Sequence, residues 1–306
     1  MFIFRTLSAC DVTERQKTDF MTKTRLPSIL CKYYRNNAFL KNALTNNEIY
    51  FASLTDLNDP FESLFAYDQD QKIIDFVSKN ANDETRIKFT SEAEIKFVRT
   101  LLLSDAKARL SQFGIACFTI DPTHQLMWSH YAQNYQGVCL MFSLYHDVKY
   151  FEPIDRISYQ ETLPKIKNPG DEKLFFEELI DILFTKSSEW KYEREYRLMK
   201  RIGVHKYNPI SLNGIIFGYK MAKKEVDEIV GITRHKYPHL DYLLAVPNPS
   251  EYKIDIYDYF DREKLEVIMD IDFDTQTNKS KNAYNFCVVE YGLDCICLEC
   301  KPSGAD

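Results

Sequence analysis

The sequence predicts an α+β fold, with a mixed but mainly antiparallel central sheet and flanking helices. Three observations lead to this prediction. Short apolar segments of strand length recur along the chain. Amphipathic helical segments occur among them, without the regular alternation that is typical of a doubly wound parallel sheet. Hydrophobic residues make up 45% of the chain, including 21 Phe and 20 Tyr, which is enough for a packed interior.

The first elements are predicted over residues 30–62. Residues 30–34 form a short apolar strand, residues 38–44 have apolar side chains at helical spacing, and residues 49–53 alternate as a strand does. Residues 55–62 read TDLNDPFE and predict a loop, because Asn and Asp satisfy backbone groups locally and Pro60 cannot donate to a ladder.

Three further helices are predicted. Residues 92–113 carry one apolar stripe, and a second amphipathic helix starts after Asp171, which is a suitable N-cap. Residues 222–233 form the third. The stripe of the first consists of Ile95, Val98, Leu102, Ala106 and Leu110, and that of the second of Leu174, Phe175, Leu179, Ile182 and Leu183. Strands are expected at 114–119, 137–142, 196–199, 214–217, 242–246 and 253–257.

One domain is predicted over residues 30–270, since no Gly-, Ser- or Pro-rich linker divides them and no internal repeat is present. Residues 1–29 are a lead-in, and residues 271–306 are a C-terminal extension that contains cysteines. No segment approaches the roughly 18 consecutive apolar residues that span a bilayer, and the start turns polar too early for a signal peptide. A cytoplasmic protein without a membrane partner is expected.

The formal net charge is −6, so the whole molecule offers no broad electrostatic attraction to nucleic acid or anionic lipid. Four cysteines lie near the C-terminus, at Cys287, Cys295, Cys297 and Cys300. The last three are spaced CxCxxC, which differs from the two paired CxxC motifs of zinc sites. We therefore expect ordinary reduced thiols and no metal.

The first candidate motif is Asn58-Asp59-Pro60-Phe61-Glu62, directly after a predicted strand. It is a candidate part of an active site, because active sites are assembled from loops that are distant in sequence. The competing interpretation is a tight loop in which an Asx side chain caps the backbone.

The second motif, Trp128-Ser129-His130-Tyr131-Ala132, gathers three ring side chains within four residues. Such a group can stack a flat ring and move a proton. An aromatic core helix with a structural histidine is the alternative.

The third motif is Tyr192-Glu193-Arg194-Glu195-Tyr196-Arg197, at the start of a strand. Alternation places Glu193, Glu195 and Arg197 on one face, so that the guanidinium keeps a neighbouring carboxylate ionised. A solvated strand edge would also carry such charges.

These three motifs, together with Lys32-Tyr33, Ile49 to Ser53 and Gly137-Val138-Cys139-Leu140, resemble the signature of bacterial domain-of-unknown-function family twenty-nine seventy-one over about residues 30–218. Their order also resembles, more distantly, the ADP-ribosyltransferase plan. That resemblance implies NAD as a substrate, a macromolecular acceptor of protein or nucleic acid, and a role in a bacterial toxin or phage-defence system.

The same resemblance implies roles for particular residues. Glu195 would be the catalytic carboxylate, and His130 would orient the ribose or the acceptor. The first strand would supply Lys32, Tyr33 or Arg35 for NAD, and the second strand Tyr50 and Ser53. The nicotinamide would stack on Tyr33, Tyr50 or Tyr131, and Lys32, Arg35 or Arg197 would neutralise the pyrophosphate. Asn58, Asp59, Glu62 and Trp128 complete the expected site.

The first strand departs from the transferase plan, because no single Arg or His stands where such an enzyme places it, and the chain has no Gly-rich phosphate loop. Two other classes therefore stay open. One is a metal-dependent nuclease or hydrolase that uses Asp59, Glu62, His130 and Glu195. The other is a non-catalytic module that senses a nucleotide, a peptide or a phage component.

Overall fold

The computed structural model describes residues 26–67, 92–169 and 171–261, with backbone only for 92–95. These residues divide into two compact units, and the chain passes from one to the other four times. Unit 1 contains residues 26–50, 117–154 and 204–261, and unit 2 contains 51–67, 92–116 and 155–203. Strands β2 (Glu48–Ser53) and β4 (Phe113–Thr119) contribute residues to both. The single domain over 30–270 stays a prediction.

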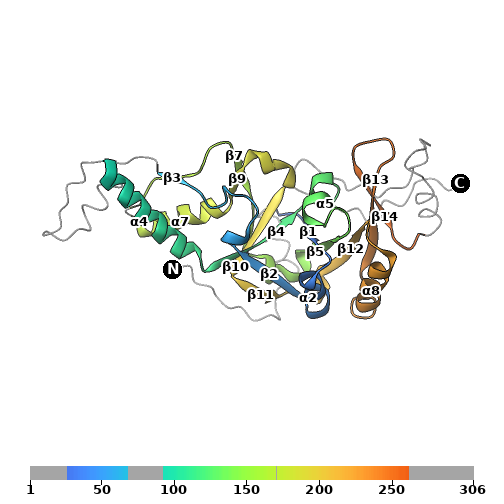
Figure 1. Ribbon diagram of the computed structural model, residues 1–306. Coiled ribbons are helices and arrows are strands. Elements are labelled where there is room, and N and C mark those ends of the chain that lie inside the picture. Colours follow the sequence, from blue (N-terminus) through green and yellow to red (C-terminus); the bar gives the residue numbers. More distant parts are fainter. Residues whose placement is uncertain (1–25, 68–91, 170, 262–306) are drawn as a thin grey trace. The chain divides into compact units, whose positions relative to one another are not determined.

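Unit 1 is built on a mainly antiparallel sheet. The last residue of β4, Thr119, pairs with β1 (Ile29–Tyr34) at one edge of this sheet. The strands that follow β1 in spatial order are β5 (Val138–Ser143), β12 (Leu212–Gly218), β13 (Asp241–Pro247) and β14 (Ile254–Asp258). Only β12 and β13 pair in parallel among these neighbours, and helix α8 (Lys223–Thr233) connects them in sequence. In Figure 1, β12, β13 and β14 lie side by side with α8 beside them. The mainly antiparallel α+β prediction is confirmed.

Short helices accompany this sheet. Helix α2 (Ala38–Asn46) begins at Asn37, whose side chain accepts hydrogen bonds from the first-turn amides, and α2 contacts α8. Helix α5 (Gln125–Tyr131) contacts β1. The remaining elements of unit 1 are η3 (Tyr145–Asp147), α6 (Val148–Phe151), η5 (Pro209–Ser211) and β11 (Gly203–Lys206), whose first residue falls in unit 2.

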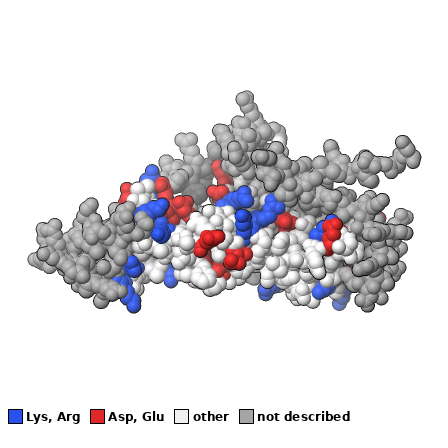
Figure 2. Space-filling view, turned by 90° about the horizontal axis from the view of Figure 1, so that it is seen from above, with Lys and Arg blue, Asp and Glu red and all other residues white. Residues whose placement is uncertain are grey.

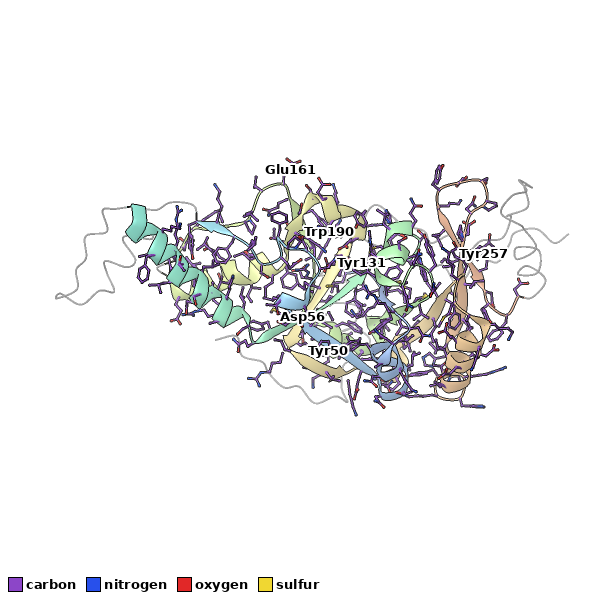
Figure 3. The ribbon with its side chains drawn as sticks, viewed as in Figure 1. Tyr50, Asp56, Tyr131, Glu161, Trp190 and Tyr257 are labelled. Carbon is purple, nitrogen blue, oxygen red and sulfur yellow. The ribbon has the colours of Figure 1, made fainter. Side chains whose placement is uncertain are left out.

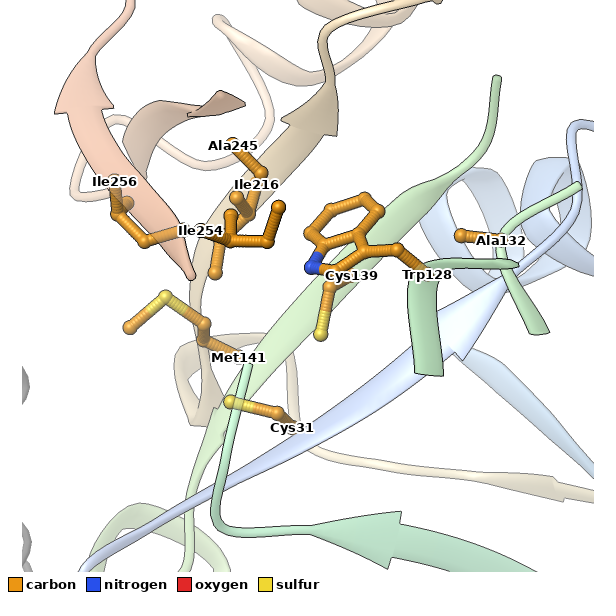
Figure 4. Close-up of a cluster of buried hydrophobic side chains, with 9 residues drawn as sticks. All are labelled: Cys31, Trp128, Ala132, Cys139, Met141, Ile216, Ala245, Ile254 and Ile256. Atoms are coloured by element: carbon orange, nitrogen blue, oxygen red, sulfur yellow. The ribbon is translucent and has the colours of Figure 1, made fainter. Parts of the chain in front are cut away.

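A hydrophobic cluster lies against the unit 1 sheet (Figure 4). It joins residues of β1, of α5 and its C-cap, and of β5, β12, β13 and β14, namely Cys31, Trp128, Ala132, Cys139, Met141, Ile216, Ala245, Ile254 and Ile256. Because these side chains come from separate stretches of sequence, their burial ties the sheet together and supplies the main hydrophobic stabilisation of this face.

Unit 2 has a second core between two helices. Helix α4 (Glu92–Leu110) and helix α7 (Glu172–Leu183) lie side by side in Figure 1, and the cluster they share consists of Ala106, Leu110, Ile166, Phe175, Leu179, Ile182 and Leu183. The other elements are η1 (Leu54–Asp56), β3 (Ala66–Tyr67), β6 (Ile154–Arg156), β7 (Ser158–Gln160), β8 (Lys165–Ile166), β9 (Thr185–Ser187), η4 (Ser188–Glu193) and β10 (Glu195–Arg201).

The predicted helical stripes are largely confirmed. Val98, Leu102, Ala106 and Leu110 are buried, and Asp171 caps α7 by accepting from two first-turn amides. Leu174 is an exception, since it is exposed at the first turn while the four residues after it in the stripe are buried. Three predictions lie outside the described residues: the side chain of Ile95, the lead-in up to residue 25, and the C-terminal cysteines.

Charged side chains on the face shown in Figure 2 are of both signs and interspersed with uncharged surface. On this face, the described residues form no broad field of one sign, in keeping with the modest net charge. No helix among the described residues has the length and apolarity needed to cross a membrane.

Candidate functional site

A buried ion pair opens strand β10 in unit 2. Nε of Arg197 donates to Oε1 of Glu195 at 2.8 Å, and Nη2 donates to Oε2 at 3.3 Å. Arg197 is 1% exposed and Glu195 is 2% exposed. They stand two positions apart on one strand, so they share a face, as alternation predicts. The bidentate contact fixes the orientation of both side chains.

Lys186, at the centre of β9, connects a second carboxylate to this pair. Its Nζ donates to Oε2 of Glu193 at 2.5 Å and to Oε2 of Glu195 at 3.1 Å, and it lies 4.8 Å from the centroid of the Trp190 ring. No sequence feature indicated this lysine, because its neighbours in TKSSE carry no motif.

The expected position of Glu193 was wrong in one respect. Alternation placed it on the strand with Glu195, whereas it ends the 3-10 helix η4. Arg194, between them, has a left-handed backbone with φ of 47°, which breaks the strand period. Glu193 nevertheless lies beside Glu195, because Lys186 contacts both carboxylates.

The NDPFE motif reaches the same network through Glu62. Nη1 of Arg197 contacts Oε1 of Glu62 and also donates to the carbonyl oxygen of Leu183 at 2.6 Å. The Glu62 side chain is 3% exposed. Two of the three predicted motifs thus meet in the interior of unit 2.

The start of the NDPFE motif is a turn of the expected Asx type. Asp59 is buried, and its Oδ1 accepts the backbone N–H of Phe61 at 2.9 Å. Phe61 is 61% exposed, and Asn58 is also exposed. Ser63, the next residue after the motif, has φ of 61°. The loop therefore combines a local cap with a strained position at its end.

Tyr159 supports the backbone of the network. Its hydroxyl accepts the N–H of Glu195 at 2.8 Å. Burial raises the pKa of this hydroxyl well above its usual range, and the N–H donated by Glu195 opposes that shift. The hydroxyl is therefore neutral at physiological pH. No sequence feature distinguished Tyr159 from the other tyrosines of the chain.

The predicted residues of the first strand lie in unit 1. Nζ of Lys32 donates to the carbonyl oxygen of Cys117 at 3.0 Å and lies over the rings of Tyr34 and Phe118. The half-buried Tyr33 donates from its hydroxyl to the carbonyl oxygen of Asp121 at 3.3 Å. Burial raises the pKa of Tyr33 well above its usual range.

Three more predicted residues lie near these positions in sequence. Arg35 is exposed after the end of β1, and Tyr50 (Figure 3) is exposed on β2. The ring of Tyr50 packs against that of Phe39, with 5.2 Å between their centroids. Ser53, in the unit 2 part of β2, accepts the N–H of Thr55 and caps η1.

The WSHYA motif forms helix α5 and divides into an inner and an outer part. Trp128 is fully buried, and its Nε1 donates to the carbonyl oxygen of Pro122 at 2.7 Å. Its ring is therefore a core side chain, and the cofactor contact expected of Trp128 stays a prediction. His130 is exposed and Tyr131 is half-buried, with ring centroids 6.1 Å apart.

The turn after α5 has unusual backbone geometry that the sequence did not predict. Gln133, Asn134 and Tyr135 all have positive φ, of 50°, 54° and 67°. Such consecutive left-handed residues are strained for L-amino acids. The turn is held by its neighbours, because a Cβ on Gly218 would lie 2.2 Å from the carbonyl oxygen of Tyr135, and one on Gly137 would lie equally close to the carbonyl oxygen of residue 34.

The predicted site residues are therefore distributed over both units. Glu62, Glu195 and Arg197 meet in unit 2, whereas Lys32 and His130 lie in unit 1. A single site formed by all of them stays a prediction. Among the described residues, no cluster of three His, Cys, Asp or Glu side chains is arranged to hold a metal ion.

Comparison with known proteins gives one match. Residues 127–198 match the family model described as "Protein of unknown function (DUF2971)", which confirms the resemblance to that family. The NDPFE motif lies outside the matched segment. Searches of curated proteins and of solved structures found no significant match. The likeness to ADP-ribosyltransferases stays a prediction.

Proposed function

We propose that this chain is an NAD-dependent, ADP-ribosyltransferase-like enzyme that modifies a macromolecule in a bacterial toxin or phage-defence system. One observation carries the proposal: the NDPFE motif and the third motif (Tyr192 to Arg197), far apart in sequence, join through Arg197 into one buried network with Glu62 and Glu195. Active sites commonly assemble from loops and strand ends that are distant in sequence.

The proposed reaction needs a carboxylate that stays charged. The bond between C1′ of the ribose and the nicotinamide nitrogen breaks, and nicotinamide leaves with the electron pair. The acceptor nucleophile then bonds to C1′ and loses its proton. Positive charge develops on the sugar, so a fixed negative charge nearby lowers the barrier. Arg197 and Lys186 support this role for Glu195, because adjacent cations favour its ionised form and fix its position.

The remaining predicted residues keep their proposed roles. His130 is exposed on α5 and is suited to orient the ribose or the acceptor. Tyr131, half-buried beside it, and Tyr33 or Tyr50 are the candidate rings for stacking nicotinamide. Lys32, Arg35 and Arg197 remain the proposed partners of the pyrophosphate.

A comparison of two Glu→Gln variants tests the proposal. Purified wild-type protein, Glu195→Gln and Glu189→Gln are incubated with NAD and bacterial lysate, and mass spectrometry follows free nicotinamide and ADP-ribosylated products. Glu189 lies on η4, outside the buried network, so its variant is the matched control. Release of nicotinamide by the wild type and by Glu189→Gln but not by Glu195→Gln is the expected result. Equal release by all three proteins would rule out Glu195 as the catalytic carboxylate.

A non-catalytic binding module is the second candidate. The observation that favours it is the burial of Glu195 beside two cations, because a structural ion network has the same geometry. This candidate expects nucleotide binding without turnover, and equal binding by Glu195→Gln. The metal-dependent hydrolase would instead give a rise in melting temperature with divalent ions and none with NAD.

A further inference from the structure

Two neighbouring side chains at the end of the NDPFE loop carry buried oxygen atoms that have no hydrogen-bond partner among the described residues. They are Oε2 of Glu62 and Oγ of Ser63. The other Glu62 oxygen is occupied by Arg197. Within the part of the chain that the structure describes, the carboxylate is therefore half satisfied, although its side chain is 3% exposed.

Such a pair is uncommon in a folded protein. Most buried polar atoms have a partner, and one left without costs about 1–3 kcal/mol, or more for a charged group. Here both atoms belong to consecutive residues of one loop. The two groups offer a ligand different hydrogen-bonding capacities: the carboxylate oxygen only accepts a hydrogen bond, whereas the serine hydroxyl both donates and accepts one.

The loop holds the two oxygens in place. The N–H of Glu62 donates to the carbonyl oxygen of Asp59 at 3.0 Å, and that of Leu64 donates to the carbonyl oxygen of Phe61 at 3.1 Å. Arg197 fixes Oε1, so Oε2 keeps one orientation. Ser63 has a left-handed backbone with φ of 61°, and strained positions of this kind cluster at ligand-binding sites.

We infer that Glu62 Oε2 and Ser63 Oγ hold the hydroxyl groups of a ribose. A vicinal diol supplies two O–H donors and two acceptor oxygens, which matches a carboxylate next to a hydroxyl, and acidic side chains bind the ribose 2′-hydroxyl in this way. A phosphate would be repelled by the carboxylate. This inference rests on the proposed function, and it assigns the ribose hydroxyls to Glu62 because the oxygens of Glu195 already bind Arg197 and Lys186.

Binding selectivity tests this assignment without relying on turnover. Isothermal titration calorimetry compares NAD with the analogue that lacks the 2′-hydroxyl of the nicotinamide ribose. The proteins are wild type, Glu62→Gln, Ser63→Gly and the control Glu161→Gln, an exposed position in the same unit (Figure 3). Glycine accepts the left-handed backbone of Ser63 and removes only the hydroxymethyl group, so this variant carries the test if Glu62→Gln fails to fold.

The wild type and Glu161→Gln are expected to bind NAD roughly tenfold or more tightly than the analogue, as for a hydrogen bond to a charged group. In Glu62→Gln and Ser63→Gly this ratio falls towards one. An unchanged ratio in both variants, or a ratio of one in the wild type, would overturn the ribose assignment while NAD binding still supports the proposed function. Absence of NAD binding by the wild type would overturn both.

Discussion

Arg197 and Glu62 lie 135 positions apart in the sequence, and Nη1 of Arg197 contacts Oε1 of Glu62 inside unit 2. The same guanidinium binds Glu195 through Nε and Nη2. One cation therefore connects two carboxylates that come from different motifs. Because all three side chains are at most 3% exposed, the loss of this cation would leave buried charge without compensation.

Replacement of Arg197 should destabilise the protein strongly. Arg197→Ala leaves Glu62 and Glu195 without their shared partner, and breaking a buried ion pair from one side costs about 3–5 kcal/mol of the free energy of unfolding. Arg201→Ala, at the exposed end of the same strand, should change it by about 0.5 kcal/mol or less. Urea unfolding followed by circular dichroism measures both. Similar losses in the two variants would contradict the network.

Two glycine substitutions should have opposite effects. In Gly218→Ala the new Cβ would lie 2.2 Å from the carbonyl oxygen of Tyr135, and such overpacking costs about 1–3 kcal/mol. Gly231 lies within α8, and a methyl group added there would have nothing within 4 Å, so Gly231→Ala should stabilise by up to about 1 kcal/mol. Thermal unfolding of both variants decides the matter, and a tolerated Gly218→Ala would argue against a rigid turn at Tyr135.

Tyr67 should make the stability fall at high pH. Burial and the nearby Asp105 raise the pKa of Tyr67 to about 12, whereas an unfolded tyrosine titrates near 10. Between these values the unfolded chain loses the phenolic proton and the folded chain keeps it, so the free energy of unfolding decreases as the pH rises. The contribution is fully present below about pH 10.

The Tyr67→Phe variant tests that pH dependence. It should show a smaller decrease in stability between about pH 10 and 12 than the wild type, whereas Tyr252→Phe, at a 99% exposed position, should behave as the wild type does. Since the Tyr67 hydroxyl is buried without a hydrogen-bond partner among the described residues, its removal should not lower the stability at about pH 7. Chemical unfolding across this pH range is the measurement, and parallel curves for Tyr67→Phe and wild type would contradict the shift.

Cys139 should resist alkylation while the protein is folded. Its side chain is fully buried, and burial raises the pKa of its thiol well above the usual range, so little reactive thiolate forms. Cys31, also buried, should be protected with it, and the half-buried Cys117 should react sooner. Peptide-resolved mass spectrometry after iodoacetamide treatment checks the order. Labelling of Cys139 as fast as in urea would place it outside the core.

The sequence by itself determined the local structure. The apolar stripe of α4, the Asp171 cap of α7 and the strand lengths follow from side-chain periodicity and capping, which depend on residues within one or two turns. The contact between Glu195 and Arg197 was likewise predictable, because residues two positions apart on a strand share a face.

Only the tertiary structure decided which distant groups meet. No local spacing links Glu62 or Lys186 to Glu195, and nothing in the sequence distinguishes a buried Trp128 from an exposed one. These outcomes depend on chain closure over many residues and on the packing of whole elements, which place a side chain inside or outside irrespective of its neighbours in sequence. Among the residues that the structure describes, this packing leaves Oε2 of Glu62 without a hydrogen-bond partner, and that oxygen carries the most specific inference about ligand binding.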